Sequence, residues 1–367
     1  MKNIITYTQE NLNTFDQYPF NSVDSLILSS AAYIHFPDVI PETKNWKGIR
    51  LQELYRAELF DEMFHNIPLC EDTKQLFYAM AASPRFRNIR IMGYTEQFDL
   101  TTEKQFSAMT FQLRPDLYYI AFRGTDSTLV GWKEDFNMAF KCPVPSQEEA
   151  VRYLEKATFY CRGKLLTGGH SKGGNLAVYA AAMCRKNIQS RIEKIYSHDG
   201  PGFLESTLQS RDFKQISARI EKTIPQSSII GMLLEHQEDY TIVKSNKSGL
   251  LQHDQFTWEI EGNNFIYIDK LTKDAKFADK TLTDWLHQIS EDDRERFVDA
   301  LYGVLNANHL TSIDDFRSDW QTAIPATFHA IAQLDGDTKK FILHTLKKLA
   351  SMGIKNVSMF GKEKQGI

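Results

Sequence analysis

An α/β fold, with a mostly parallel central sheet covered by helices, is predicted from three observations on the sequence. After residue 85, segments typical of strands alternate with segments of helical periodicity, which is the pattern of a parallel sheet. The segment LYYIAF at 117–122 is apolar throughout, as expected of a strand buried on both faces. Hydrophobic residues make up 42% of the 367 residues and charged residues 25%, so the chain can bury a large core.

The first 85 residues are expected to be mainly helical. The segment 21–36 begins with an Asn/Ser cap and then repeats apolar residues at helical spacing, and a second helix is expected at 70–82. Three strands follow, at 89–100, 104–113 and 117–124. The first two alternate in polarity, which indicates edge or half-exposed strands.

The alternation then continues to the end of the expected sheet. Its elements are helix 147–161, strand 164–169, helix 171–186, strand 193–200, helix 204–217 and strands 219–225 and 239–245, followed by a β-hairpin at 256–269 that turns near Gly262-Asn263. From Lys270 onwards only helices are expected, at 281–289, 291–305, 319–334 and 338–353. The sequence therefore predicts a domain over 1–269, with a helical segment 1–85 at its start, and a helical subdomain over 270–367.

Charge and composition exclude several classes of protein. The net charge of −4 gives no reason to expect a nucleic-acid partner. The four cysteines show no CxxC, zinc spacing or disulfide framework, so we expect buried reduced thiols in a cytoplasmic protein, with no metal and no cofactor. The N-terminus does not resemble a signal peptide, and the longest apolar runs, such as 26–34, are too short to span a membrane. The sequence does not decide whether the protein contacts a membrane peripherally.

The strongest functional signal is the motif Gly169-His170-Ser171-Lys172-Gly173. A strand precedes it and an alanine-rich helix follows, which is the context of the nucleophile elbow in the α/β-hydrolase fold. The sharp turn needs small residues on both sides of the serine, and it leaves the backbone N–H of Lys172 where an oxyanion would form. The non-catalytic interpretation of this motif is a glycine-rich loop that only reverses the direction of the chain. A phosphate-binding loop fits poorly, because Lys172 precedes Gly173.

A second motif, AFRGTDSTLVGWKEDF, follows the apolar strand. FRGT, Trp132 and Asp135, together with GHSKGG, resemble the core of the fungal-type class 3 lipases over residues 85–255. The resemblance implies that Thr125 contributes a backbone N–H, and its hydroxyl, to an oxyanion hole. It also implies structural roles for Arg123 and Asp135, either as a pair or as surface ions.

The chain departs from those lipases at two positions. They carry an apolar residue after the serine, where this chain has Lys172. Their catalytic acid follows the strand after the next helix, where this chain reads TIPQSSIIG and offers only Ser227 and Ser228. The chain thus resembles a bacterial branch of lipase-like hydrolases that carries the GHSKGG elbow.

The base is expected to be a histidine late in the sheet, because the fold runs in the order Ser, acid, His. Eight of the ten histidines lie elsewhere: before the elbow, on the elbow, at the end of the next strand or in the C-terminal helical region. This leaves His236 and His253 as candidates for the base. His253 is preferred, because it follows the strand at 239–245 whereas His236 precedes it.

Asp199 is the preferred acid. It ends the strand directly after the elbow helix, at the sheet edge where catalytic loops gather. Pancreatic-type lipases, which this stretch resembles in its Asp and Gly/Pro run, take their acid from the same strand. Asp239 is the second candidate for the acid. Asp254 is next to His253 in the chain and could not easily fold back onto its ring. The alternative role of Asp199 is to cap a turn.

Lys172 allows two interpretations. Its charge attracts an anionic group of the substrate, or its side chain turns away from the pocket and is held by a carboxylate such as Asp135. The second is preferred, because only the backbone N–H of Lys172 has a required role.

Together these residues predict a lipase- or esterase-like serine hydrolase of small-molecule or lipid esters. Its catalytic residues are Ser171, His253 and Asp199, and its oxyanion hole is formed by Lys172 and Thr125. An amidase or peptidase would use the same triad, and a catalytically inactive binding or scaffolding protein is the remaining alternative. The helical regions 1–85 and 270–367 either cover the active site as a lid or pack as ordinary core.

Overall fold

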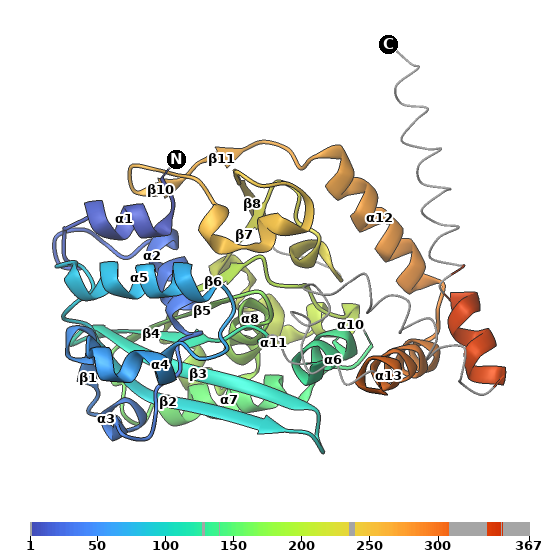
Figure 1. Cartoon of the computed structure of the whole chain (residues 1–367), viewed down its shortest axis with the longest axis horizontal. Coiled ribbons are helices and arrows are strands. Elements are labelled where there is room, and N and C mark those ends of the chain that lie inside the picture. The colour runs from blue at the N-terminus through green and yellow to red at the C-terminus, as the bar shows by residue number, and fades with distance from the viewer. Residues whose placement is uncertain are drawn as a thin grey trace, which may run out of the picture.

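The computed structural model describes residues 2–126, 129–138, 140–234, 239–307, 336–345 and 347. A mixed sheet lies at the centre of this described part (Figure 1). In spatial order its strands are β1 (Ile49–Arg50), β2 (Arg90–Asp99), β3 (Lys104–Arg114), β4 (Leu117–Phe122), β5 (Lys164–His170), β6 (Ile192–His198), β7 (Ile220–Pro225), β8 (Tyr240–Val243) and β11 (Tyr267–Ile268).

Strands β4 to β8 form the parallel core of this sheet. Strands β1 to β4 pair antiparallel on one side, and β11 pairs antiparallel with β8 on the other. The predicted fold class is therefore confirmed: a mostly parallel sheet covered by helices. The hairpin predicted around Gly262-Asn263 is also present, as β9 (Ile260–Glu261) and β10 (Asn264–Phe265).

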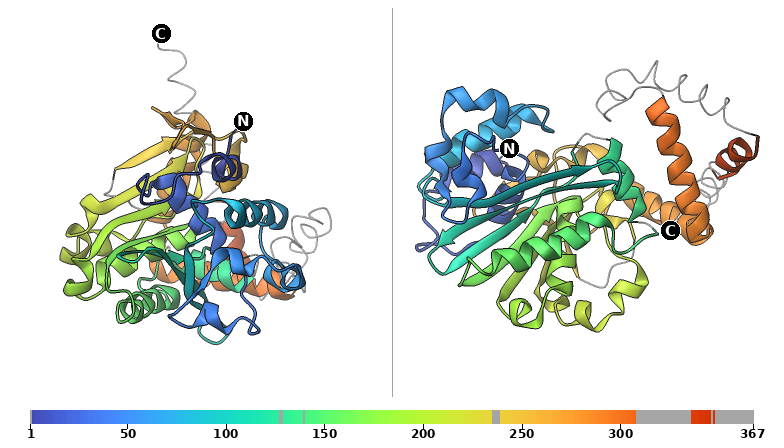
Figure 2. Two further views of the ribbon diagram at one scale, coloured as in Figure 1. Left: turned by 90° about the vertical axis from the view of Figure 1, so that its left-hand side faces the viewer. Right: turned by 90° about the horizontal axis from the view of Figure 1, so that it is seen from below.

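Helices cover both faces of the sheet, and β4 shows why. Tyr119 and Ala121 belong to a hydrophobic cluster built with the N-terminal helices, whereas Ile120 and Phe122 belong to a second cluster built with α7 (Pro145–Ala157) and α8 (Lys172–Met183). Successive side chains of a strand point to opposite faces, so the two clusters lie on opposite sides. Figure 2 shows the blue N-terminal segment and the green α7 on the two sides of the strands.

The N-terminal segment therefore packs as core on one face. Its main helices are α1 (Ile4–Glu10), α2 (Ser22–Ala31) and α5 (Cys70–Ala82), and a capping box between Asn21 and Asp24 begins α2. Arg85 and Asp24, both fully buried, pair at 2.5 Å and fix the end of the segment against α2. The shorter α-helices of the chain are α3 (Pro41–Lys44), α4 (Phe60–Met63), α9 (Lys186–Gln189), α10 (Glu205–Leu208) and α11 (Arg211–Lys214).

Three local predictions need correction. Strand β3 is almost wholly buried rather than half-exposed, because β2 and β4 flank it and α7 packs against it. The helix predicted at 204–217 is two short helices, since Ser210 caps α11 and interrupts the run. All four cysteines are free, but Cys70 and Cys142 are only half-buried.

The chain after the sheet is helical as far as it is described. Helix α12 (Lys273–His287) leads into α13 (Glu291–Ala307), which contacts α6 (Leu129–Asn137). Residues 336–345 are also helical, whereas the helix predicted at 319–334 and most of the one predicted at 338–353 lie outside the described residues. Within the described part, every helix is too short or too polar to cross a membrane.

Candidate active site

Ser171 occupies a sharp turn between β5, which ends at His170, and α8, which begins at Lys172. Its backbone has φ 58° and ψ −133°, a strained conformation for a residue with a side chain, and such strain is characteristic of functional sites. A Cβ on Gly169 would overlap the backbone of Gly173, and one on Gly173 would overlap the Phe122 carbonyl. Both glycines are therefore required for the turn that presents Ser171.

Asp199 and His253 are brought together at the same edge of the sheet. Asp199 directly follows β6, and its Oδ2 accepts a hydrogen bond from His253 Nδ1 at 2.6 Å. The carboxylate is 1% exposed and the imidazole 28% exposed. An imidazole that gives Nδ1–H to a carboxylate keeps Nε2 as its proton acceptor. The Asp199 carboxylate thus fixes both the orientation and the tautomer of the His253 ring.

Ser228 completes the hydrogen bonding of the buried acid. The second oxygen of Asp199, Oδ1, accepts from Ser228 Oγ at 2.5 Å and from the Gly231 N–H at 3.1 Å. Sequence reasoning noted Ser228 only as a residue standing where related lipases carry their acid. A serine at the position where the acid is missing is therefore a sequence signal that a nearby carboxylate accepts a hydrogen bond from it.

His170 supports the backbone of His253. His170 Nε2 donates to the His253 carbonyl oxygen at 2.8 Å, and the two ring centroids lie 4.6 Å apart. Burial, together with the neighbouring His253 and His198, lowers the pKa of His170 well below the usual value, so this ring is neutral. His170 is thus placed to hold the base rather than to act as one.

The buried neutral histidines make stability depend on pH. Burial lowers the pKa of His198 to about 3, and that of His170 is also low, so the unfolded chain binds more protons than the folded chain below about pH 6.5. These two histidines should therefore lower the free energy of unfolding by about 1.5 kcal/mol between about pH 7.5 and pH 6, of which about 1 kcal/mol should remain after the opposing effect of Asp135. Urea unfolding at the two pH values measures this change.

The control for this prediction is a single histidine variant. His198→Asn should remove about half of the histidine contribution, whereas Gln in place of the exposed His344 should leave it unchanged. A stability that is constant or rises towards pH 6 would contradict the prediction. Asp135, whose pKa is raised to about 6, gives the opposite sign and offsets about 0.4 kcal/mol of this loss at pH 6.

The Lys172 side chain turns away from the surface and is 1% exposed. Its Nζ donates to Gln105 Oε1 at 2.7 Å, to the Gln105 carbonyl at 3.0 Å and to Glu134 Oε2 at 3.1 Å. Asp135, the carboxylate suggested from the sequence, lies further away at 3.8 Å. Lys172 is also the first residue of α8. The side chain is structural, and the backbone N–H is left without a partner inside the helix.

Thr125 lies on the loop after β4, next to the elbow. Its hydroxyl donates to Asp135 Oδ2 at 2.5 Å, and burial raises the pKa of Asp135 to about 6, although Lys172 and Thr125 oppose the rise. A hydroxyl has one hydrogen, so in this arrangement the Thr125 hydroxyl has none left to donate to another acceptor. The bond to Asp135 fixes the loop that carries Thr125.

The pairing of Arg123 with Asp135 that the sequence suggested is wrong. Arg123 pairs instead with Glu96 at 2.6 Å and with Asp126 at 3.8 Å. The cause is strand register: the Arg123 N–H bonds the Ser107 carbonyl on β3, and Ser107 lies opposite Glu96 on β2. Arg123 and Glu96 are therefore level across the sheet.

The other sequence candidates are placed elsewhere. Asp239 is exposed and directly precedes β8, whereas Asp199 follows β6, so in this parallel pairing the two lie at opposite ends of the sheet. Asp254 caps a short 3-10 helix through the Phe256 N–H. His236 lies outside the described residues. Among the residues that the structure describes, no group of three or more His, Cys, Asp or Glu side chains is arranged to hold a metal ion.

The parallel core with a strand–elbow–helix unit is the fold of the lipase-like α/β-hydrolases. The chain belongs to the Mbeg1-like family, whose model matches residues 80–303. No curated protein matches the chain at a significant level.

The solved structures with a similar fold include three lipases. A Rhizomucor miehei lipase in complex with its propeptide is 16% identical, with 57% of this chain and 70% of that chain covered and a TM-score of 0.34. A fungal lipase–inhibitor complex is 16% identical, covering 60% and 77%, with a TM-score of 0.37. Lip2 lipase from Yarrowia lipolytica is 12% identical, covering 58% and 80%, with a TM-score of 0.31.

Proposed function

We propose that this chain is a serine hydrolase that cleaves carboxylic esters through Ser171, His253 and Asp199. The observation that carries the proposal is the 2.6 Å hydrogen bond from His253 to the buried Asp199, at the sheet edge where Ser171 is presented on its strained turn. Bonds from His170 and Ser228 to the two members of this pair support it further.

The chemistry proceeds in two balanced halves. His253 Nε2 takes the Ser171 hydroxyl proton while Oγ attacks the ester carbonyl carbon, and the resulting oxyanion accepts from the N–H groups of Lys172 and Thr125. Collapse of this intermediate expels the alcohol, which takes the proton from His253 and leaves an acyl group on Ser171. Water then attacks the acyl carbon and gives a proton to His253, and the acid departs as Ser171 is reprotonated. Asp199 stabilises the imidazolium in both halves.

A fluorophosphonate probe tests the nucleophile directly. The wild-type chain should gain one probe mass by intact-mass analysis, and Ser171→Ala should gain none, because only an activated serine attacks phosphorus. Ser190→Ala, which removes an exposed serine outside the site, serves as the matched control and should label fully. Labelling that persists in Ser171→Ala would reject this assignment, and a panel of esters of varied acyl length then measures turnover in the same variants.

A further inference from the structure

His198, the last residue of β6, lies between the proposed nucleophile and the proposed acid. Its carbonyl oxygen accepts the Ser171 N–H at 2.9 Å, and Asp199 is the next residue in the chain. Ser171 and Asp199 both have positive φ, 58° and 50°, and such conformations persist where the surrounding structure holds them in place. The backbone of His198 therefore joins the two residues whose conformations most need support.

The buried ring of His198 is bonded by a hydroxyl group at each nitrogen. Nδ1 lies 2.7 Å from Thr223 Oγ1 on β7, and Nε2 lies 2.9 Å from Ser25 Oγ on α2. Burial lowers the pKa of His198 to about 3, so the ring is neutral and has one N–H to donate and one nitrogen to accept. A hydroxyl can take either part, so both bonds form at once and fix the ring from two sides. The carbonyl of Thr223 also accepts the Asp199 N–H at 2.7 Å.

Ser25 is in turn held by a second bond across the sheet. Ser25 and Ser29 lie one turn apart on α2, and the hydroxyl of each lies 2.8 Å from the Tyr119 hydroxyl on β4. A Cβ on Gly168 of β5 would overlap this phenol, so the strand that leads to the elbow leaves room for it. Ser25, Ser29, Tyr119 and His198 are all fully buried. A continuous chain of hydrogen bonds therefore runs from α2 to the end of β6.

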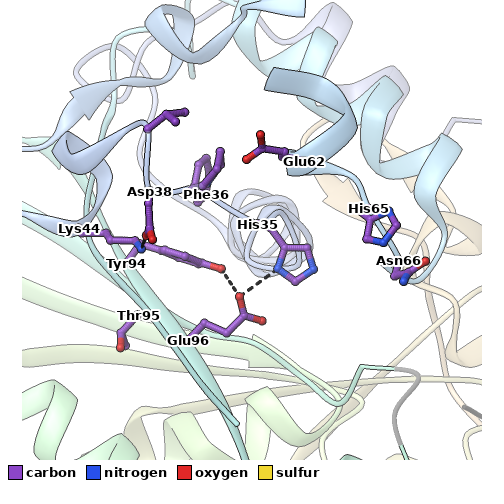
Figure 3. Close-up of a pocket in the computed structure, with 12 residues that line it drawn as sticks. His35, Phe36, Asp38, Lys44, Glu62, His65, Asn66, Tyr94, Thr95 and Glu96 are labelled. Atoms are coloured by element: carbon purple, nitrogen blue, oxygen red, sulfur yellow. Dashed lines mark hydrogen bonds and ion pairs between the residues drawn. The ribbon is translucent and has the colours of Figure 1, made fainter. Parts of the chain in front are cut away.

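The turn after α2 reaches the loop that follows β4. Tyr33 packs against this loop, since a Cβ on Gly124 would overlap the Tyr33 hydroxyl. Glu96 accepts from His35 Nδ1 at 3.0 Å (Figure 3) and pairs at 2.6 Å with Arg123, the residue before Gly124. The N-terminal segment thus contacts the proposed active site at two places, the end of β6 and the loop after β4.

We propose that α2 is a positioning helix of the active site: Ser25 fixes the ring of His198, and the backbone of His198 holds Ser171 and Asp199 in the geometry that the reaction needs. The inference rests on the proposed function, because the geometry of these residues affects turnover only if they react with an ester. Ser25 and His198 are both fully buried, so neither touches the substrate. Their loss should therefore lower kcat without weakening substrate binding.

Two serine variants of the same helix test this role. Ser25→Ala removes the bond to His198 and one bond to Tyr119, whereas the matched control Ser29→Ala removes one bond to Tyr119 and leaves His198 bonded. With p-nitrophenyl butyrate as the ester, Ser25→Ala should lower kcat and kcat/KM equally, by about 10- to 100-fold, since small displacements of positioned groups have effects of this size. Ser29→Ala should keep kcat within about twofold of the wild type. The rate of fluorophosphonate labelling should fall in parallel with kcat.

A second variant acts on the other side of the ring. Thr223→Val removes the hydroxyl at Nδ1 with little change of shape and should give the same loss of kcat as Ser25→Ala. Thr110→Val, which removes a buried hydroxyl bonded to Tyr153, is its control and should leave kcat unchanged. Urea unfolding shows which variants are folded under the assay conditions. If Ser25→Ala does not fold, Thr223→Val and its control decide the question in the same way.

Wild-type kcat in a folded Ser25→Ala or Thr223→Val would overturn the positioning role while ester hydrolysis stands. An equal loss of kcat in Ser29→Ala would overturn it as well, because the effect would then come from the packing of α2. Absent probe labelling and absent hydrolysis of every ester in the wild type would instead overturn the proposed function, and this inference with it.

Discussion

Asp199→Asn is expected to lower kcat about 10³- to 10⁴-fold while leaving the fold intact, because an amide is isosteric with the carboxylate but cannot stabilise the imidazolium or enforce its tautomer. The structure gives the reason: Asp199 accepts at once from His253, Ser228 and Gly231, so the loss of its charge affects every bond that orients the base. Steady-state turnover of the best ester, with circular dichroism as the check on folding, measures the effect.

The control for this prediction is Asp239→Asn. Asp239 was the alternative acid by sequence, and it lies exposed at the start of β8. Its variant should retain wild-type turnover, because an exposed carboxylate at the other end of the sheet cannot reach His253. A larger loss in Asp239→Asn than in Asp199→Asn would reverse the assignment of the acid.

Lys172→Met is expected to destabilise the protein by about 3–5 kcal/mol, because it removes one partner of a buried pair and leaves Glu134 charged. Catalysis should fall as well, by about 10- to 100-fold, since small displacements of positioned donors have effects of this size. In the proposed mechanism Lys172 offers its backbone N–H to the oxyanion, and its side chain binds Glu134 on α6, the helix that follows the Thr125 loop. Urea unfolding and the rate of fluorophosphonate labelling measure the two effects separately.

The double variant Lys172→Met with Glu134→Gln distinguishes packing from positioning. Glu134→Gln removes the carboxylate that Lys172→Met leaves unpaired. Much of the lost free energy of unfolding should therefore return in the double variant. The labelling rate should stay low, because the ion pair that joins Lys172 of the elbow to Glu134 of α6 is then absent. If the labelling rate recovers in step with stability, Lys172 contributes only to packing and the positioning role is rejected.

The sharp turn at Ser171 can be predicted from the sequence for a local reason. The turn needs Gly169 and Gly173 at fixed offsets from Ser171. Because backbone steric clashes act over only a few residues, this motif can be recognised from the sequence alone. Asp199 and His253 could be proposed from chain order alone, because the loops that follow parallel strands gather at one edge of the sheet. The structure places these two residues in hydrogen-bonding contact, 54 positions apart in the chain.

Ion-pair partners could not be read from the sequence in the same way. Arg123 was matched with Asp135, yet it pairs with Glu96, and Lys172 lies closer to Glu134 than to Asp135. Neighbouring carboxylates on α6 point to different sides of the helix, and the choice between them depends on how α6 packs. Strand β3 was judged half-exposed for a similar reason, because its alternating pattern carries no information on the helices that cover it.

The sequence by itself therefore determined the fold class, the serine turn and the order in which acid and base follow it, since these depend on periodicity, glycine spacing and connectivity. Only the tertiary structure decided which charges meet and that Ser228 and His170 bind the proposed acid and base. Those features depend on strand register and helix packing between segments far apart in the chain, and short-range patterns do not encode distances of that kind.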